Sequence, residues 1–283
     1  VTMMCRSGLI SIFLWLAPLL LGYPKTACAS HFVLLETGYR YEDNFSRTVS
    51  AGDQKDDWVF TTRLKIGKPV QLRAGFTSSV AVNFSKDFFN TYNRLENHSV
   101  GISISVNRKL GLGFYAPRLR IYTTWSDYRF KDDLWDNALF VTGLQIRKHF
   151  TDRFETQLAF KYDQRDANNA IFERTGRTVS LRTGYLVGQD FQLSVQFARR
   201  EGDVVVHNKN WWPPGAPWTW NTTFNTRMAA YRVRARTQML SLSLSKRLDR
   251  QSSLTAVVER QTTEWQMMEY PNDMFRVEYV RRY

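Results

Sequence analysis

Cysteine is almost absent from this chain. The sequence holds only two, Cys5 and Cys28, and both lie within its first 28 residues. Beyond them no disulfide can form, and no thiolate can serve as a nucleophile or a metal ligand. Histidine is scarce as well, with four in 283 residues. No metal-ligand spacing, phosphate-binding glycine loop or nucleotide motif is present, so we expect neither a metal ion nor any other cofactor.

The sequence also lacks an apolar run long enough for a membrane-spanning helix. The longest run covers residues 9–22, is interrupted by Pro18 and falls short of the ~18 apolar residues that a span requires. It is followed by Ala27-Cys28-Ala29, which places small residues at the two positions that a signal peptidase reads. We therefore expect residues 1–29 to be a cleaved signal peptide and residues 30–283 to form one mature domain.

Acidic residues are few compared with basic ones. The chain has 39 lysines and arginines against 26 aspartates and glutamates, a formal net charge of +13. Removal of Arg6 and Lys25 with the signal peptide lowers this to +11. Such a charge suits nucleic acid, an anionic membrane surface or an acidic solute. Because an exported chain does not meet nucleic acid, we expect no nucleic-acid partner.

Helical periodicity is missing after Ser30, and apolar residues instead alternate with polar ones, as in strands that have one apolar face. In the first such segment Val33, Leu35 and Tyr39 share one face, while Glu36 and Arg40 share the other. About twelve strands are predicted, near residues 33–42, 58–66, 70–84, 100–106, 118–125, 138–148, 154–163, 178–187, 191–200, 236–246, 253–263 and 274–283.

The connections between these strands alternate in length. Short ones are expected at residues 67–69, 108–111, 149–153, 187–190 and 247–251. Long ones are expected at residues 43–57, 85–98, 128–137, 164–176, 201–227 and 265–273. This rhythm is typical of an up-and-down sheet with tight turns at one end and long loops at the other.

A soluble β-sandwich also has alternating strands, but three features favour a membrane barrel. Many segments have about ten residues, the length that a tilted strand needs to cross a bilayer; their number is even; and aromatic residues gather at both ends of the strands. A sheet in lipid cannot leave edge amides unpaired, so it must close on itself. The predicted fold is therefore all-β, a closed, antiparallel, up-and-down transmembrane β-barrel.

The last ten residues, "MFRVEYVRRY", place Phe275, Val277, Tyr279 and Tyr283 on alternate positions. This stretch resembles the C-terminal strand signal of Gram-negative outer-membrane barrels, although Arg281 stands where an apolar residue is usual. The resemblance implies location in the cell outer membrane, contact with its lipid, recognition by the barrel assembly machinery and termini in the periplasm. The stretches "GYRYEDNF" and "IRKHFTDRFETQLAF" are similar to barrels of exopolysaccharide export and of surface lipoprotein assembly modifiers.

The strand parities place a set of basic side chains inside the barrel. They are Arg40, Arg63, Lys65, Arg73, Arg118, Arg120, Arg147, Lys161, Arg182 and Arg200. Fewer acidic residues share that face, namely Glu36, Glu42, Glu155, Asp163 and Glu259. Fixed positive charge in a pore concentrates anions, so we predict a narrow passive channel that favours small or oligomeric acidic solutes. Alternatively, these charges pair across the lumen in a non-conducting accessory barrel of a polysaccharide-export or surface-assembly system.

The longest predicted loop is rich in tryptophan and proline, in the stretch "NWWPPGAPWTWNTTF". Trp211, Trp212, Trp218 and Trp220 suit stacking on sugar rings at the cell surface, and anionic oligosaccharides are the expected partners. The same loop could instead fold into the lumen as a constriction or dip into the outer leaflet. The sequence leaves these three arrangements open.

An enzyme is the third interpretation, because some outer-membrane barrels hydrolyse or modify lipids. Such catalysis would need a nucleophile, a base and an orienting group close together. The only candidate bases of the histidine type are His31, His98, His149 and His207. None has a recognisable serine or carboxylate partner in the sequence. We therefore predict that the protein is not an enzyme and has no catalytic residues.

Overall fold

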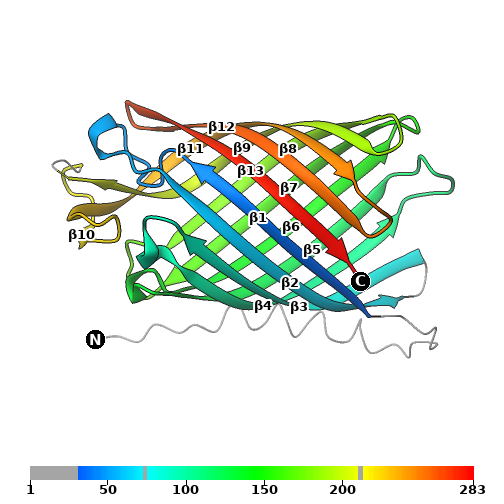
Figure 1. Ribbon diagram of the computed structural model, residues 1–283, viewed down its shortest axis with the longest axis horizontal. Coiled ribbons are helices and arrows are strands. Elements are labelled where there is room, and N and C mark those ends of the chain that lie inside the picture. Colours follow the sequence, from blue (N-terminus) through cyan, green and yellow to red (C-terminus); the bar gives the residue numbers. More distant parts are fainter. Residues whose placement is uncertain (1–30, 73–74, 210–212) are drawn as a thin grey trace.

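The computed structural model describes residues 31–72, 75–209 and 213–283, and almost all of its regular structure is strand (Figure 1). The strands are β1 Phe32–Glu42, β2 Asp57–Gln71, β3 Phe76–Phe89, β4 Asn97–Lys109, β5 Arg118–Phe130, β6 Asn137–His149, β7 Phe154–Ala167, β8 Arg174–Val187, β9 Phe191–Asn208, β10 Trp218–Asn221, β11 Met228–Arg247, β12 Ser252–Trp265 and β13 Met268–Arg282. In the described ranges three short 3-10 helices lie in the loops: η1 Ala51–Asp53, η3 Asn93–Leu95 and η4 Asp133–Trp135.

All strands except the short β10 form one closed wall. Each pairs antiparallel with its neighbour along the chain, β9 pairs with β11, and β13 pairs back onto β1. The backbone N–H of Tyr283 donates to the carbonyl oxygen of Val33 at 2.8 Å, which completes the closure. The predicted antiparallel barrel of 12 strands is therefore confirmed. In the described ranges no helix is both long and apolar enough to cross a membrane.

The outer surface of the wall is a belt of exposed aliphatic and aromatic side chains. Members of the belt on nine strands are Val80, Val82, Val100, Ile102, Ile121, Leu144, Leu158, Leu181, Val195, Phe197, Leu240, Leu242 and Val258. They occupy every second position, so the residues between them point inward. Soluble proteins rarely expose a continuous apolar surface of this kind, whereas a barrel in a bilayer requires it.

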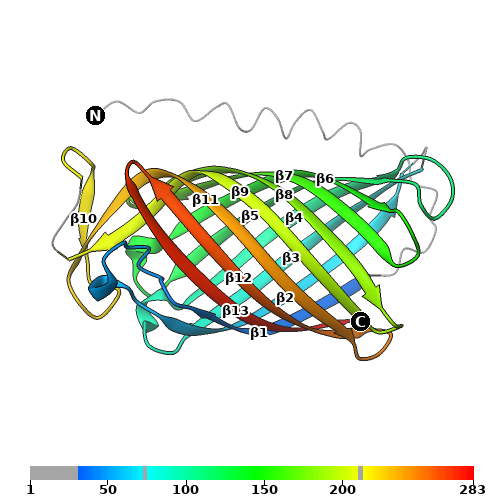
Figure 2. The same cartoon turned by 90° about the horizontal axis from the view of Figure 1, so that it is seen from above.

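The barrel has unlike ends (Figure 2). At the end where β1 begins and β13 stops, which we call the short-turn end, basic side chains lie over aromatic rings. Lys148 lies 4.9 Å from the ring centre of Phe150, and Arg281 lies 5.0 Å from that of Tyr283. This contact accounts for the unusual Arg281, because its charged group covers the terminal aromatic ring at the level where headgroups would lie.

Two predicted connections were wrong, and each contains a proline. Residues 67–69 lie within β2, and the long connection expected at 265–273 is a two-residue turn between β12 and β13. Pro69 pairs with β3, but the pairing of β2 with β1 has already ended at Gly67. Pro271 pairs with β12, but the pairing of β13 with β1 begins only at Met274. Each proline therefore stands on a strand edge that has a partner on one side only, where a missing N–H is tolerated.

The predicted long connection 201–227 is also partly strand. β9 continues to Asn208 and β11 begins at Met228, and the two remain paired over this length. The β8–β9 pairing ends at Gly202, and the β11–β12 pairing starts at Arg236. The ends of β9 and β11 therefore pair with each other but not with β8 or β12, and they are released from the wall.

Candidate functional site

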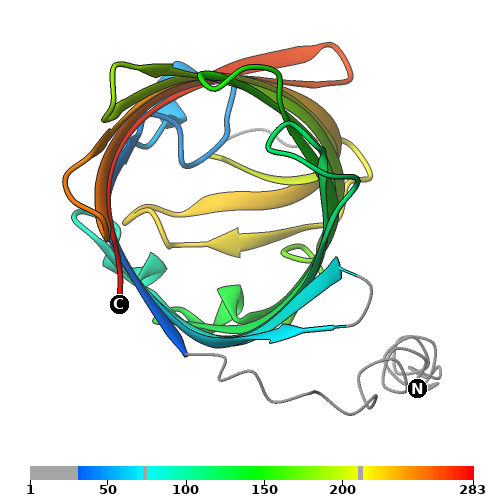
Figure 3. The same cartoon turned by 90° about the vertical axis from the view of Figure 1, so that its right-hand side faces the viewer.

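The released ends of β9 and β11 cross the mouth of the barrel at the long-loop end, and we call this element the plug. It consists of residues 203–208 and 228–235, together with β10, which pairs with β11. In Figure 3, which looks along the barrel from the short-turn end, these yellow and gold strands lie across the opening. Residues 204–208 and 228–231 are all buried, so the plug is covered on both faces.

One face of the plug packs against the outer ends of β12 and β13. Val206 and Tyr231 are register partners, and they meet Trp265 and Tyr270 in one buried cluster. The rings of Tyr231 and Trp265 are 6.1 Å apart in an edge-to-face arrangement. The predicted long loop 265–273 would have left this face uncovered, whereas the extended hairpin of β12 and β13 supplies its partner.

The other face packs against the loops that follow β3, β5 and β7. One cluster here contains Ile171, Phe172, Val205 and Ala230, and a second contains Tyr92, Leu95, Phe224 and Met228. Trp135 packs against both clusters. Its ring lies 4.4 Å from that of Phe172 and 5.5 Å from that of His207. Trp135 therefore connects the wall loops to the centre of the plug.

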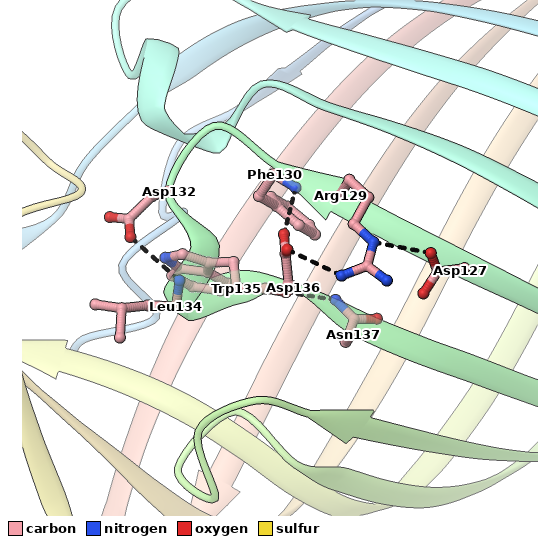
Figure 4. A network of polar contacts seen from close by, with 8 residues as sticks. All are labelled: Asp127, Arg129, Phe130, Asp132, Leu134, Trp135, Asp136 and Asn137. Atoms are coloured by element: carbon pink, nitrogen blue, oxygen red, sulfur yellow. Dashed lines mark hydrogen bonds and ion pairs between the residues drawn. The ribbon is translucent and has the colours of Figure 1, made fainter.

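A polar network in the loop between β5 and β6 holds Trp135 in this position (Figure 4). The carboxylate of Asp136 accepts hydrogen bonds from the backbone N–H of Phe130 at 2.7 Å and from the guanidinium of Arg129 at 3.3 Å. The side-chain amide of Asn137 donates to the carbonyl oxygen of Trp135 at 2.6 Å. Because the carboxylate and the amide fix the backbone on both sides of the tryptophan, its indole is held toward the plug.

Thr223, in the connection between β10 and β11, ties the plug to the same loop. Its buried hydroxyl accepts from the indole N–H of Trp135 at 2.9 Å and donates to the carboxylate of Asp132 at 3.2 Å. The adjacent loops are joined as well, since the N–H of Lys131 donates to the carbonyl oxygen of Glu96 at 2.9 Å. The loops and the plug thus form one hydrogen-bonded cap over the barrel.

His207 lies at the centre of this cap, beyond the last β8–β9 pair and so outside the wall. Its backbone N–H donates to the carbonyl oxygen of Ser46 at 2.9 Å. Within the described ranges neither ring nitrogen has a hydrogen-bond partner. Burial is the main cause that lowers the pKa of His207 to about 3, and the nearby cations Arg47 and Arg174 contribute to the same shift. The imidazole is therefore neutral at neutral pH.

A cavity of about 290 Å³ lies directly beneath the plug. Val204 and Tyr270 belong both to the apolar cluster of the plug and to the wall of this cavity. The charged residues that line it are Arg47, Lys161, Arg165, Arg174 and Arg200 on the basic side and Asp163 on the acidic side. Five cations face one carboxylate, so the cavity favours negative charge.

The basic residues predicted to line the pore occupy inward-facing positions where they are described. These are Arg40, Arg63, Lys65, Arg118, Arg120, Arg147, Lys161, Arg182 and Arg200, whereas Arg73 lies outside the described residues. Arg63 is 3.9 Å from both Glu36 and Glu278, and Arg147 pairs with Glu155. Within the described part of the chain no ion pair is made by Arg40, Lys65, Arg118, Arg120 or Arg182.

Three of the arginines at the cavity were missed by the sequence analysis. Arg165 and Arg174 fall in the predicted loop 164–176, and Arg47 falls in the predicted loop 43–57. Arg165 shares the inward-facing parity of Lys161 and Asp163 on β7, so the alternation of this strand could have predicted its position. Nothing in the local sequence shows that the loop after β1 turns inward to bring Arg47 to the same cavity.

The described tryptophans of the longest loop lie on β10, at the edge of the plug, and not in its buried part. Trp218 and Trp220 lie on β10, are each 39% exposed, and their rings meet edge to face at 5.1 Å. Arg227 covers Trp220, with 4.1 Å between the guanidinium carbon and the ring centre. Trp211 and Trp212 lie outside the described residues. Contact of these tryptophans with a solute stays a prediction.

The histidines are spread over both ends of the barrel. His149 lies at the short-turn end, where its ring nitrogen is 3.6 Å from Glu155. His31 precedes β1 at that end, while His98 lies at the start of β4, at the opposite end. Among residues 31–72, 75–209 and 213–283, no cluster of histidine, cysteine, aspartate and glutamate could hold a metal ion.

No family model and no curated protein sequence matches this chain. Among solved structures it resembles an outer membrane channel from Pseudomonas putida F1, with 12% identity, a TM-score of 0.60 and coverage of 93% of this chain and 98% of that one. The chain shares the β-barrel fold of that protein. Lower similarity to this chain is found for the KdgM porin, solved in complex with disordered oligogalacturonate, and for the NanC porin. Each is 12% identical over 88% of this chain and 98% of the porin, with TM-scores of 0.45 and 0.46.

Proposed function

We propose that the protein is a passive channel of the outer membrane that favours small acidic solutes. The observation that carries the proposal is the inward-facing positive charge, which is concentrated at the cavity beneath the plug and is met there by one carboxylate. Charge of one sign on a pore wall raises the local concentration of counter-ions and repels ions of its own sign. No chemical reaction is needed for this role.

The channel is oriented with its short-turn end, and so with both ends of the barrel wall, in the periplasm. The short connections at this end support the placement, because outer-membrane barrels have short turns on the periplasmic side and longer loops outside. The plug then lies on the cell surface. In this orientation the C-terminal strand is available to the barrel assembly machinery.

The plug also favours a second candidate function, a non-conducting accessory barrel of an export or surface-assembly system. Its strands are buried on both faces and bonded to the surrounding loops. A barrel with that cap conducts only when the cap moves or leaves a passage beside it. Conductance of the folded protein therefore separates the two functions.

Reversal of two inward-facing charges is expected to change ion selectivity. Arg118 and Arg120 are exposed to the lumen at the short-turn end and make no ion pair within the described ranges. We expect Arg118→Glu with Arg120→Glu to lower the preference for chloride over potassium by roughly tenfold, since local ion concentrations follow the sign of the wall charge. Reversal potentials across planar bilayers in a potassium chloride gradient measure this ratio.

The matched control for this variant is Arg177→Glu. Arg177 lies within the paired wall, shares the outward-facing parity of Val179 and Leu181 on β8 and is exposed. Its reversal changes the net charge of the protein without changing the inward-facing surface, so selectivity is expected to stay as in the wild type. An unaltered anion preference in the double variant, or a cation preference in the wild type, would reject the proposed channel.

A further inference from the structure

We infer that the cavity beneath the plug is a binding site for a carboxylated sugar. The inference rests on the proposed channel and specifies the solute that it takes. The cavity, at about 290 Å³, is near the lower limit of the range of about 300–1,000 Å³ that is typical of small-molecule sites. It therefore suits one sugar residue of a larger solute or a single sugar acid.

The basic groups at this cavity are not neutralised by the protein. The guanidinium of Arg200 is 2.9 Å from the carboxylate of Asp163, and the ammonium of Lys161 is 3.8 Å from it, so two cations share one acid. Within the described residues Arg165 and Arg174 form no ion pair. Cations held close together repel one another, and a bound carboxylate would offset that repulsion with bidentate hydrogen bonds.

Arg200 is positioned through a glycine on the neighbouring strand. Its guanidinium crosses Gly176 of β8 to reach Asp163 of β7, and Gly176 is the register partner of Asp163. A Cβ atom on Gly176 would lie 2.2 Å from a terminal nitrogen of Arg200. The side chain is flexible, so an alanine there would displace the guanidinium with little cost to the fold.

Arg47 reaches the cavity from a strained turn. Its φ of 56° is left-handed, a conformation that costs a non-glycine residue roughly 1–2 kcal/mol. The turn is held by buried hydrogen bonds, in which Asn44 accepts from the hydroxyl of Ser46 at 3.1 Å and from the N–H of Thr48 at 3.2 Å. Strain of this kind persists where the surroundings impose it and is concentrated at functional sites. Here it brings a fifth cation to the cavity.

The opposite side of the cavity carries no charge. It is formed by β12, which contributes Gln261 and Thr263, and by β13, which contributes Tyr270 and Asn272. The side-chain oxygen of Asn272 has no hydrogen-bond partner within the described ranges. Amides, hydroxyls and a phenol ring suit the hydroxyl groups of a sugar, while the arginines suit its carboxylate. A simple inorganic anion would use only the basic side.

Binding is tested by calorimetric titration of the folded, detergent-solubilised barrel with galacturonate, galactose and sulfate. We expect saturable binding of galacturonate, at least tenfold tighter than that of either other probe. Arg165→Gln with Arg174→Gln is expected to weaken galacturonate binding at least tenfold. The matched control, Arg118→Gln with Arg120→Gln, removes two lumen cations away from the cavity and should bind as the wild type does.

Two single variants separate binding from folding. Arg47→Gly relieves the left-handed strain, so we expect an unchanged or higher unfolding temperature together with at least threefold weaker galacturonate binding. Gly176→Ala is expected to weaken binding by displacing Arg200 while the barrel stays folded. Wild-type affinity in both variants would overturn the assignment of this site.

The remaining outcomes also decide the question. Equal binding of galacturonate and galactose, or absence of saturable binding, would overturn the inference. If bilayer recordings still show anion preference, the proposed channel function would remain supported without this binding site. Equal binding of sulfate and galacturonate would overturn the sugar specificity. Specific galacturonate binding by a barrel that never conducts would support the site and reject the channel.

Discussion

Alanine in place of Trp135 is expected to open the barrel. Trp135 packs against both apolar clusters on one face of the plug and donates a hydrogen bond to Thr223. Truncation of a buried tryptophan costs about 3–5 kcal/mol, and Trp135 is partly exposed, so we expect about 3 kcal/mol. If that loss falls on the plug, its opening equilibrium rises roughly a hundredfold. Open probability in single-channel recordings measures the change.

Trp125→Ala is the matched control for this experiment. Trp125 lies on β5, the strand that precedes the loop of Trp135, but its side chain is 46% exposed on the outer belt. Its removal deletes the same number of atoms without touching the plug, so open probability is expected to remain at the wild-type level. A folded Trp135→Ala barrel with wild-type open probability would show that the plug does not govern passage.

Acidification is expected to open the same plug through His207. In the closed state burial lowers the pKa of this histidine to about 3, whereas an exposed histidine has a pKa of about 6.5. A histidine with a lowered pKa stabilises the closed state fully above about pH 6.5, and this contribution is lost progressively as the pH falls toward 3. At about pH 5 the loss is about 2 kcal/mol, which raises the opening equilibrium roughly thirtyfold.

The pH dependence is checked by recording open probability at neutral pH and near pH 5. His207→Phe keeps an aromatic ring against Trp135 but cannot be protonated, so its open probability should no longer rise on acidification. The control His98→Gln removes an exposed histidine at the same end of the barrel and should leave the rise intact. An equal rise in His207→Phe would assign the effect to another group.

The wall of the barrel could be predicted from the sequence because one physical rule governs it. Lipid outside and water inside impose an alternation on every strand, so segments such as 118–125 and 236–246 stand out without any knowledge of their neighbours. The errors involve residues whose structural role depends on the register between neighbouring strands. Pro69 and Pro271 have the appearance of turn residues, and only the staggered ends of β1 show why a strand tolerates them.

The plug and the cavity could be predicted only in part. Residues 203–208 are apolar enough for a buried strand, but the sequence does not say that they leave the wall and meet Trp135. Arg165 and Arg174 follow from the parity of β7 and β8 once those strands are extended. The position of Arg47 depends on the fold of the loop after β1, and its place at the same cavity as Arg165 and Arg174 is set by tertiary structure.

The proposed function depends on an anion-favouring passage that the plug restricts. Single-channel recordings of the wild type and of Trp135→Ala in a potassium chloride gradient test both parts together. We predict rare openings in the wild type, frequent openings in the variant, and in both a reversal potential of the sign that chloride preference gives. Cation preference, or the absence of any conductance from the folded variant, would contradict the account.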